Sequence, residues 1–188
     1  MKRMITVLLL CLFAASAVAA PAAAGDELEP TRYGVAVLSG MAYDPDTFGI
    51  GLVQGYALFD YDRVFWHEAP DDLRFRVEAN LGLAGREGQR AIASINMLAF
   101  KYLDRFAMEG RRPYLEAGIG VIYTDFQVDG QGSRINFNPQ AGAGMEWTCS
   151  DGHALQAGVR VHHISNGGLH EDNRGINSLL LTVGWLFK

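Results

Sequence analysis

The sequence predicts an all-β fold, an eight-stranded antiparallel transmembrane β-barrel of the outer-membrane type. Three observations support this prediction: an N-terminal export signal, eight segments in which apolar and polar residues alternate, and glycines gathered on the polar face of those segments. The length of 188 residues suits a single domain, because domains commonly hold roughly 100–200 residues. The predicted fold therefore rests on patterning along the whole chain.

Charge and composition exclude several classes of protein. The chain has 16 basic and 21 acidic residues, a formal net charge of −5, whereas a nucleic-acid-binding protein needs a basic face. Charged residues make up only 20% of the chain and hydrophobic residues 49%, which argues against intrinsic disorder. We therefore expect a folded chain with no nucleic-acid partner.

Residues 1–24 are predicted to be a cleavable signal peptide. Lys2 and Arg3 give a positively charged start, an apolar run follows, and small residues then offer cleavage after Ala19 or Ala24. The apolar run is shorter than the roughly 20 residues that a helical membrane span needs. The sequence therefore predicts a chain that is exported from the cytoplasm.

Residues 25–188 form the predicted mature protein, a single β-barrel domain. Cys11 lies inside the apolar run of the signal rather than after it, which argues against a lipid anchor there, and it leaves with the signal. Cys149 then remains alone, so no internal disulfide can stabilise the mature chain. No later segment reaches the length of a helical span, so a membrane location requires strands.

The mature chain contains eight segments with an alternation of period two, bounded by turn residues. Residues 44–46, Asp-Pro-Asp, separate the first two, and the connection 61–72 leads to the third. Turns rich in glycine and acidic residues follow the third, fifth and sixth segments at 85–88, 129–132 and 150–152. The segments are, in order, 32–41, 49–60, 73–83, 90–102, 114–125, 134–148, 154–165 and 176–187.

The number of segments favours a closed barrel. Eight is even, no convincing amphipathic helix interrupts the series, and closure leaves no exposed strand edge. The third segment shows the pattern, with Leu81 and Leu83 on its apolar face and Arg76 and Glu78 on its polar face. Alternation alone allows either a lipocalin-like barrel with an apolar interior or an outer-membrane barrel with an apolar exterior.

The position of the glycines favours the outer-membrane barrel. In the fifth segment Gly118 and Gly120 share the polar face with Glu116, an arrangement that suits a crowded interior. A solvated outer face would carry more lysines than the three in this chain. In the last segment Trp185 and Phe187 fall where an interfacial aromatic girdle would lie.

Three polar residues break the alternation at one hairpin. His163 and Ser165 continue the apolar face of the seventh segment, Asn177 shares the apolar face of the eighth, and the loop 166–175 joins the two. Polar groups that face hydrocarbon require an explanation. Either the hairpin has reached the headgroup region, where polar groups are normal, or the residues form a nucleophile and its base.

The second explanation has a chemical basis. Residues i and i+2 on a strand share a face, about 6.6 Å apart along the chain, so the imidazole of His163 can approach the hydroxyl of Ser165. A serine hydroxyl attacks an ester only when a base removes its proton, and a neutral histidine can take that proton and return it to the leaving group.

The same hairpin resembles the active-site segment of the lipid A 3-O-deacylase family. The matching residues are His163-Ile164-Ser165-Asn166-Gly167-Gly168-Leu169, followed by Asn173-Arg174-Gly175-Ile176. Members of that family are eight-stranded outer-membrane barrels that hydrolyse the ester-linked 3-hydroxyacyl chain at position 3 of lipid A. The resemblance implies that Ser165 is the nucleophile, that His163 is the general base, and that Asn166 with backbone amides near Gly168 forms the oxyanion hole.

One position departs from the family pattern. The resemblance implies an acid twelve residues after the serine, where this chain has Asn177. An amide oxygen can accept the imidazole N–H and fix its tautomer, but it cannot offset the imidazolium charge. Three alternatives remain: Asn177 supports a slow enzyme, Glu171 or Asp172 in the loop substitutes for it, or activity is lost.

Other clusters carry less functional weight. His162, His163 and His170 with the neighbouring acids have the composition of a metal site. However, adjacent strand residues point to opposite faces, so one ion cannot easily bind both His162 and His163. We expect no metal and no cofactor. A further set of charged residues is predicted to form a network in the barrel lumen: Arg74, Arg76, Glu78, Glu116 and Glu146.

The predicted location follows from the topology. With both ends of an eight-stranded barrel in the periplasm, the last hairpin opens on the extracellular side of the cell outer membrane. This places the hairpin beside the outer leaflet. Together with the family resemblance, that location makes lipid A, the membrane anchor of lipopolysaccharide, the expected substrate, with membrane lipids as neighbours. A homodimer is left open. The rival hypothesis is a non-catalytic barrel with a structural or adhesive role. Asn177 favours the rival, and the intact run from His163 to Asn166 favours an esterase.

Overall fold

The computed structural model describes residues 30–62 and 69–188. The predicted signal peptide, residues 1–24, lies outside this part of the chain. None of the helices in the described residues is long and apolar enough to cross a membrane. The strands are β1 (Arg32–Asp44), β2 (Phe48–Asp60), β3 (Leu73–Gly85), β4 (Gln89–Tyr102), β5 (Arg111–Thr124), β6 (Ile135–Phe137), β7 (Gln140–Thr148), β8 (Ala154–Ile164) and β9 (Ile176–Leu186), with a short 3-10 helix η1 (Asp104–Phe106) before β5.

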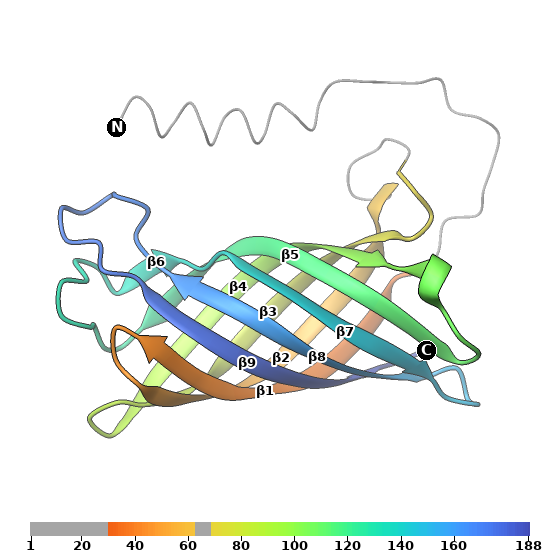
Figure 1. Ribbon diagram of the computed structural model, residues 1–188, viewed down its shortest axis with the longest axis horizontal. Coiled ribbons are helices and arrows are strands. Elements are labelled where there is room, and N and C mark those ends of the chain that lie inside the picture. The colour runs from red at the N-terminus through yellow and green to blue at the C-terminus, as the bar shows by residue number, and fades with distance from the viewer. Residues whose placement is uncertain (1–29, 63–68) are drawn as a thin grey trace.

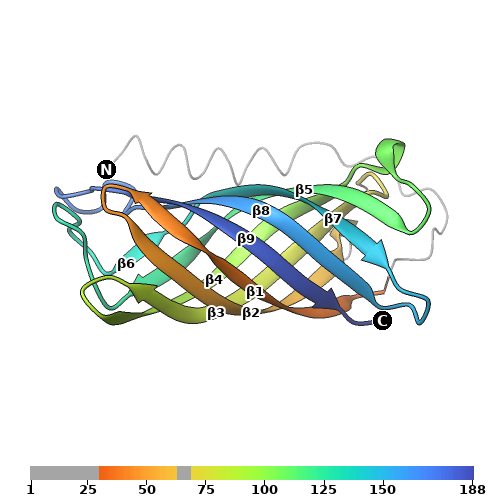
Figure 2. The ribbon, with the colours of Figure 1, turned by 60° about the horizontal axis from the view of Figure 1, so that its bottom comes forward.

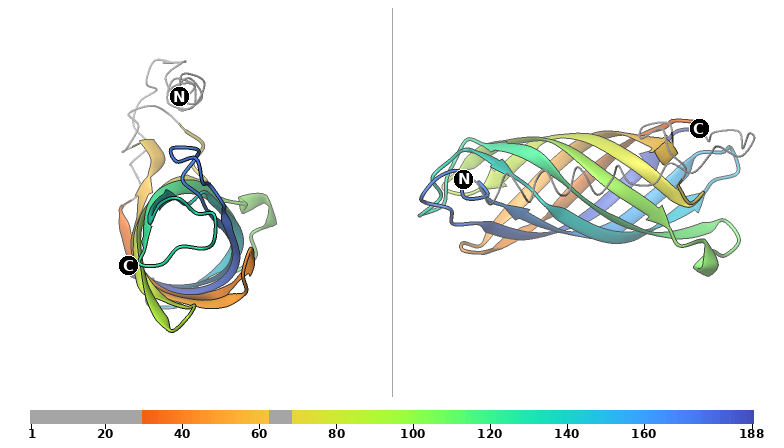
Figure 3. Two further views of the ribbon diagram at one scale, coloured as in Figure 1. Left: turned by 90° about the vertical axis from the view of Figure 1, so that its left-hand side faces the viewer. Right: turned by 90° about the horizontal axis from the view of Figure 1, so that it is seen from above.

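These strands form one closed antiparallel barrel (Figure 1, Figure 2). Consecutive strands pair with each other, except that β6 and β7 both pair with β5, and pairing of β1 with β9 joins the first strand to the last. Viewed from one end, the strands enclose a ring (Figure 3). The predicted all-β fold of outer-membrane type is confirmed.

The strands β1 to β9 occupy eight positions around the barrel, because β6 and β7 follow each other in one position beside β5. Val121 pairs with Phe137 of β6 and Gly118 pairs with Gln140 of β7, so the register against β5 continues without a shift. Pro139 separates the two strands, and proline has no N–H to donate to a ladder. The segment predicted as one strand at 134–148 is therefore interrupted, although its position in the barrel is as expected.

The apolar face of the sheet points outward and the polar face points into the lumen. Leu81 and Ile95 are 63% and 65% exposed, whereas Arg76 and Glu78 are each 1% exposed. In water this arrangement would be unstable, because it exposes apolar surface and buries charge. It is the pattern of a barrel with a hydrocarbon-facing exterior and a polar interior.

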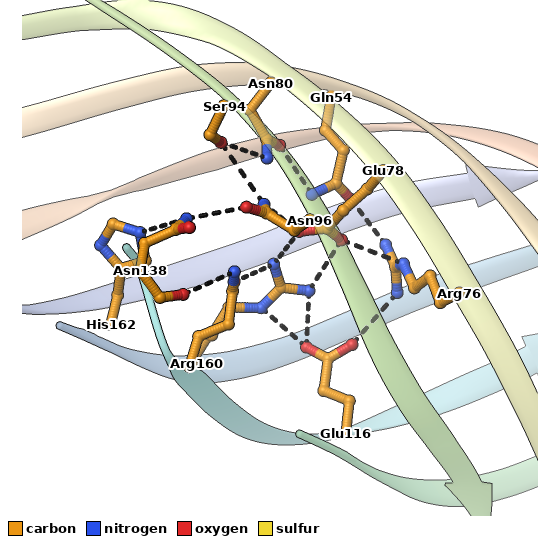
Figure 4. A network of polar contacts seen from close by, with 11 residues as sticks. Gln54, Arg76, Glu78, Asn80, Ser94, Asn96, Glu116, Asn138, Arg160 and His162 are labelled. Carbon is orange, nitrogen blue, oxygen red and sulfur yellow. Dashed lines mark hydrogen bonds and ion pairs between the residues drawn. The ribbon is translucent and has the colours of Figure 1, made fainter. Parts of the chain in front are cut away.

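A network of charged and amide groups fills the middle of the lumen (Figure 4). Arg160 lies 2.7 Å from Glu78 and 2.7 Å from Glu116, and it donates to Gln140 over 2.8 Å. Arg76 forms ion pairs with the same two glutamates at 3.3 and 3.2 Å. Two arginines, from β3 and β8, thus neutralise two glutamates, from β3 and β5.

The other predicted network residues lie toward the end that holds the C-terminus. Glu146 accepts hydrogen bonds from Arg32 and Tyr102 over 3.0 and 2.7 Å, and Arg74 donates to backbone carbonyls. Aromatic rings lie close to this second group, where the ring centroids of Phe100 and Tyr114 are 4.4 Å apart. Side chains thus occupy the lumen both in its middle, around Arg76 and Arg160, and toward the C-terminal end, around Glu146.

The two ends of the barrel differ in the segments that they carry. The start of β1 and the C-terminus lie at one end (Figure 1). The β1–β2 turn, the β5–β6 loop and the hairpin between β8 and β9 lie at the other. The candidate site is therefore at the end opposite to both ends of the described chain.

We predict that Arg160→Met lowers the free energy of unfolding by about 3–5 kcal/mol, because it leaves two buried carboxylates with Arg76 as their one remaining arginine partner. Urea unfolding of the barrel in lipid vesicles, followed by tryptophan fluorescence, measures this change. Lys101→Gln is the control, since Lys101 and Asp72 pair at 2.6 Å with side chains 45% and 26% exposed. Such a surface pair contributes about 0–1 kcal/mol. Equal losses in both variants would contradict the prediction.

Candidate active site

The candidate site lies on the outer face of the barrel at the end of the β8–β9 hairpin. His163 and Asn177 are directly opposite each other in the register of β8 and β9. His163, Ser165 and Asn177 are half-buried, and the residues between and beside them along each strand are buried. The burial pattern thus places the three predicted residues on the face expected from their parity.

A short hydrogen bond connects the imidazole to the amide. The Nδ1 atom of His163 lies 2.6 Å from Oδ1 of Asn177. The ring extends over Gly175, where a Cβ atom would lie 3.0 Å from Nε2 of His163 and closer still to Cε1. Glycine at position 175 therefore leaves the space that the imidazole occupies, and the ring is directed along the hairpin toward the level of Ser165.

Backbone pairing holds Ser165 beyond the end of β8. Its N–H donates to the carbonyl of Phe137 over 3.0 Å, and the N–H of Phe137 donates back over 2.8 Å. His163 donates its own N–H to the carbonyl of Pro139 over 3.0 Å. Both residues are thus fixed against the interrupted barrel strand, two positions apart along the chain.

Asn166 is the centre of the loop that follows. It is 1% exposed, its backbone N–H donates to Oδ1 of Asn173 over 2.8 Å, and its side-chain amide donates to the carbonyl of Asp172 over 2.7 Å. Its Oδ1 accepts from the N–H of Gly168 over 2.9 Å. Gly167 and Gly168 have φ angles of 64° and 79°, a left-handed conformation that glycine adopts without steric cost.

These bonds bear on the predicted oxyanion donors. The N–H of Gly168 is already bonded to Asn166, and one hydrogen of the Asn166 amide is bonded to Asp172. Within the described residues, no acceptor is assigned to the N–H of Gly167. The structure therefore shows Asn166 organising the loop, and it leaves the Gly167 N–H and the second Asn166 amide hydrogen uncommitted.

The two loop acids proposed as substitutes lie away from the imidazole. Glu171 and Asp172 are exposed, and Asp172 contributes its backbone carbonyl to the loop rather than its carboxylate to His163. A different carboxylate adjoins the site: Oδ2 of Asp44 accepts from the Asn177 amide over 2.7 Å. Sequence reasoning interpreted Asp44 only as part of a turn, although closure of the barrel brings the first strand beside the last.

The two adjacent histidines occupy different environments. His162 is 7% exposed and faces the lumen, where its Nε2 lies 3.3 Å from the Asn138 amide (Figure 4). Its Nδ1 lies 3.1 Å from the hydroxyl of Ser178. His163 faces outward. Across residues 30–62 and 69–188, the structure gathers no group of three His, Cys, Asp or Glu side chains suited to a metal ion.

Comparison with known proteins places this geometry in a family. The family model described as lipid A 3-O-deacylase (PagL) matches residues 55–186, well over half of the chain. The chain belongs to the lipid A 3-O-deacylase (PagL) family. Lipid A deacylase PagL of Pseudomonas aeruginosa is 32% identical over 140 residues, which cover 72% of this chain and 75% of that protein.

Solved structures agree with this family assignment and with the fold. The crystal structure of the outer membrane enzyme PagL is similar with a TM-score of 0.56 and 26% identity, covering 80% of this chain and 97% of that one. Neisserial surface protein A is similar with a TM-score of 0.66 at 16% identity, covering 87% and 99%, which speaks to the barrel fold alone. The residues matched by the PagL family model include the candidate site on β8 and β9 and exclude Asp44.

We predict that Asn166→Ala loosens the loop without unfolding the barrel. The variant removes the side-chain bonds to Asp172 and Gly168, and a buried hydrogen bond left unmade costs about 1–3 kcal/mol. Amide hydrogen exchange at Gly168 should therefore accelerate roughly 10- to 100-fold. Glu171→Ala is the matched control in the same loop, and it should leave this exchange unchanged. Equal protection of Gly168 in both variants would contradict the role of Asn166.

Proposed function

We propose that this protein is an outer-membrane esterase that removes the ester-linked 3-hydroxyacyl chain from lipid A. The observation that carries the proposal is the bond between His163 and Asn177 at 2.6 Å. This bond lies on the outer face of the barrel, two residues before a serine, in a member of the lipid A 3-O-deacylase family. An oriented imidazole beside a serine is the arrangement that nucleophilic catalysis of acyl transfer requires.

The proposed reaction proceeds in two stages. Nε2 of His163 takes the proton of Ser165 as Oγ attacks the ester carbonyl, and it then gives that proton to the departing alkoxide of the glucosamine. The acyl chain remains as an ester on Ser165. Water, deprotonated by the same nitrogen, attacks this ester and releases a 3-hydroxy fatty acid, and the proton returns to Ser165.

Asn177 serves in this mechanism as the acceptor that orients the base. Because its Oδ1 faces Nδ1 of His163, the imidazole carries its proton on Nδ1 and keeps the Nε2 lone pair for Ser165. The amide carries no charge, so it does not offset the imidazolium that forms. We therefore expect a slower enzyme than one with a carboxylate at position 177.

For the oxyanion we propose the loop that begins at Asn166. The uncommitted N–H of Gly167 and the second amide hydrogen of Asn166 are available donors next to Ser165. Gly168 becomes a donor when its N–H leaves Oδ1 of Asn166. A donor of this kind typically contributes about 10²–10³ in rate.

Access to the site is proposed to be lateral. Ser165 and His163 are on the outer face, at the barrel end opposite to the C-terminus, and charged and aromatic side chains occupy the lumen. A lipid in the outer leaflet reaches the outer face directly. The site therefore needs no lumen wide enough to admit lipid A.

We predict that Ser165→Ala abolishes deacylation, because it removes the nucleophile. Mass spectrometry of lipid A from cells that express each variant measures the loss of one 3-hydroxyacyl chain. Ser39→Ala is the matched control, since Ser39 is an exposed serine within β1, and it should retain activity. Unchanged lipid A with the wild-type protein folded in the outer membrane would refute the proposed function and leave a structural or adhesive barrel.

We also predict that Asn177→Ala lowers kcat about 10- to 100-fold, the same order as the loss when the orienting partner of a metal-ligating histidine is removed. Glu171→Ala and Asp172→Ala should retain wild-type kcat, because neither carboxylate contacts His163. Turnover of purified lipid A in detergent micelles measures all three. Loss of activity in Glu171→Ala, together with normal activity in Asn177→Glu, would contradict this prediction. It would show that the loop acid Glu171, rather than Asn177, orients His163.

A further inference from the structure

Asp44 is brought to the candidate site by the closure of the barrel. It is the last residue of β1 and pairs with Asn177 of β9. The register of β1 against β9 shifts between Ala42 and Asp44, so Tyr43 is an extra residue in the ladder. Such a bulge re-aims the side chains that follow it. Without the shift, Tyr43 rather than Asp44 would face Asn177.

Both carboxylate oxygens of Asp44 have partners. Oδ2 accepts from Nδ2 of Asn177 over 2.7 Å, and Oδ1 accepts from Nη2 of Arg174 over 3.1 Å. The side chains of Asp44 and Arg174 are 45% and 53% exposed. Asn177 in turn reaches His163, so a continuous chain of hydrogen bonds runs from a partly hydrated carboxylate to the imidazole.

We propose that Asp44, acting through the amide of Asn177, is the carboxylate that positions His163 for catalysis. This inference rests on the proposed function, and it concerns a residue outside the stretch that the family model matches. Asp44 does not touch the reacting atoms, so it is a positioning residue. It supplies the acid whose absence at position 177 is this chain's departure from the family pattern.

The argument follows from which groups can donate. An ionised carboxylate only accepts hydrogen bonds, so Asn177 must present its NH₂ to Asp44. The opposite end of the same amide is its oxygen, which must then face His163. An oxygen only accepts, so Nδ1 of His163 must carry the proton. Through two successive hydrogen bonds, Asp44 therefore determines that Nε2 is the basic nitrogen of His163.

Removal of the carboxylate releases this constraint. The Asn177 amide could then rotate and present its NH₂ to Nδ1, which would have to accept, and the imidazole proton would move to Nε2. A histidine in that tautomer cannot take the proton of Ser165. In the serine-protease triad, replacement of the acid by an amide leaves the wrong tautomer and costs about 10⁴ in kcat.

The first test compares two aspartates of the same turn. We expect Asp44→Ala to lower kcat about 10- to 100-fold, the same order as the loss when a residue that orients a metal-ligating histidine is removed, with KM nearly unchanged. Asp46→Ala is the matched control, because Asp46 is 46% exposed at its side chain and pairs with Arg86 at 2.7 Å. It should retain wild-type kcat.

A charge swap separates positioning from a structural role. The double variant Asp44→Asn with Asn177→Asp places the carboxylate directly against Nδ1 and an amide behind it, so we expect at least wild-type kcat. An ion pair between Asp44 and Arg174 that merely stabilised the turn would not be restored in this way. Failure of the swap to restore a kcat lost in Asp44→Ala would overturn the proposal.

A measurement independent of turnover completes the test. Nitrogen-15 shifts of the His163 ring in the folded barrel report which nitrogen is protonated. We expect Nδ1–H in the wild type and a shift toward Nε2–H in Asp44→Ala. An unchanged tautomer overturns the inference even if Ser165→Ala abolishes deacylation. If wild-type protein leaves lipid A intact, the proposed function fails, and the ring shifts still decide whether Asp44 positions His163.

Discussion

Closure of the sheet is the constraint on which the other features of this structure depend. Within hydrocarbon every backbone N–H and C=O must be paired inside the protein, and a sheet achieves this only when its first and last strands meet. Here β1 pairs with β9 over most of its length. Closure also buries the inward polar side chains, so they must neutralise one another, as Arg76 and Arg160 do with two glutamates.

Three irregular features of the barrel lie near the candidate site. Pro139 interrupts one strand, the extra residue Tyr43 shifts another, and Gly167 and Gly168 adopt left-handed conformations. A regular ladder would carry its apolar residues outward up to the rim. At this end the ladder is instead modified at β1 and between β6 and β7, on either side of the β8–β9 hairpin, and this hairpin is where a serine, a histidine and an amide face outward.

The alternation of the sequence was sufficient to predict the strands and their two faces, because side-chain parity is a local property of a strand. The position of the glycines on the polar face and the scarcity of lysines were needed to predict that the apolar face points outward. Parity also placed His163, Ser165 and Asn177 on one face. The loop was less predictable: Asn166 is held inward by its bonds to Asp172 and Gly168, which depend on the folded loop. The contact between Asp44 and Asn177 was beyond local reasoning, since it spans 133 positions and requires both closure and the bulge.

The chain of hydrogen bonds from Asp44 through Asn177 to His163 also places the negative charge of the carboxylate where it can be solvated. An outward carboxylate directly beside the imidazole would lie on the face that meets lipid, where an ionised group is expensive. In this chain the neutral amide occupies that place, and the carboxylate of Asp44 lies on the other side of this amide, paired with Arg174 at the partly exposed end of β1. The amide orients the imidazole because the acid orients the amide. The charge of the Asp44 carboxylate stays near water, paired with Arg174. Orientation of the base is thereby separated from electrostatic compensation of the imidazolium, which a direct carboxylate would provide together.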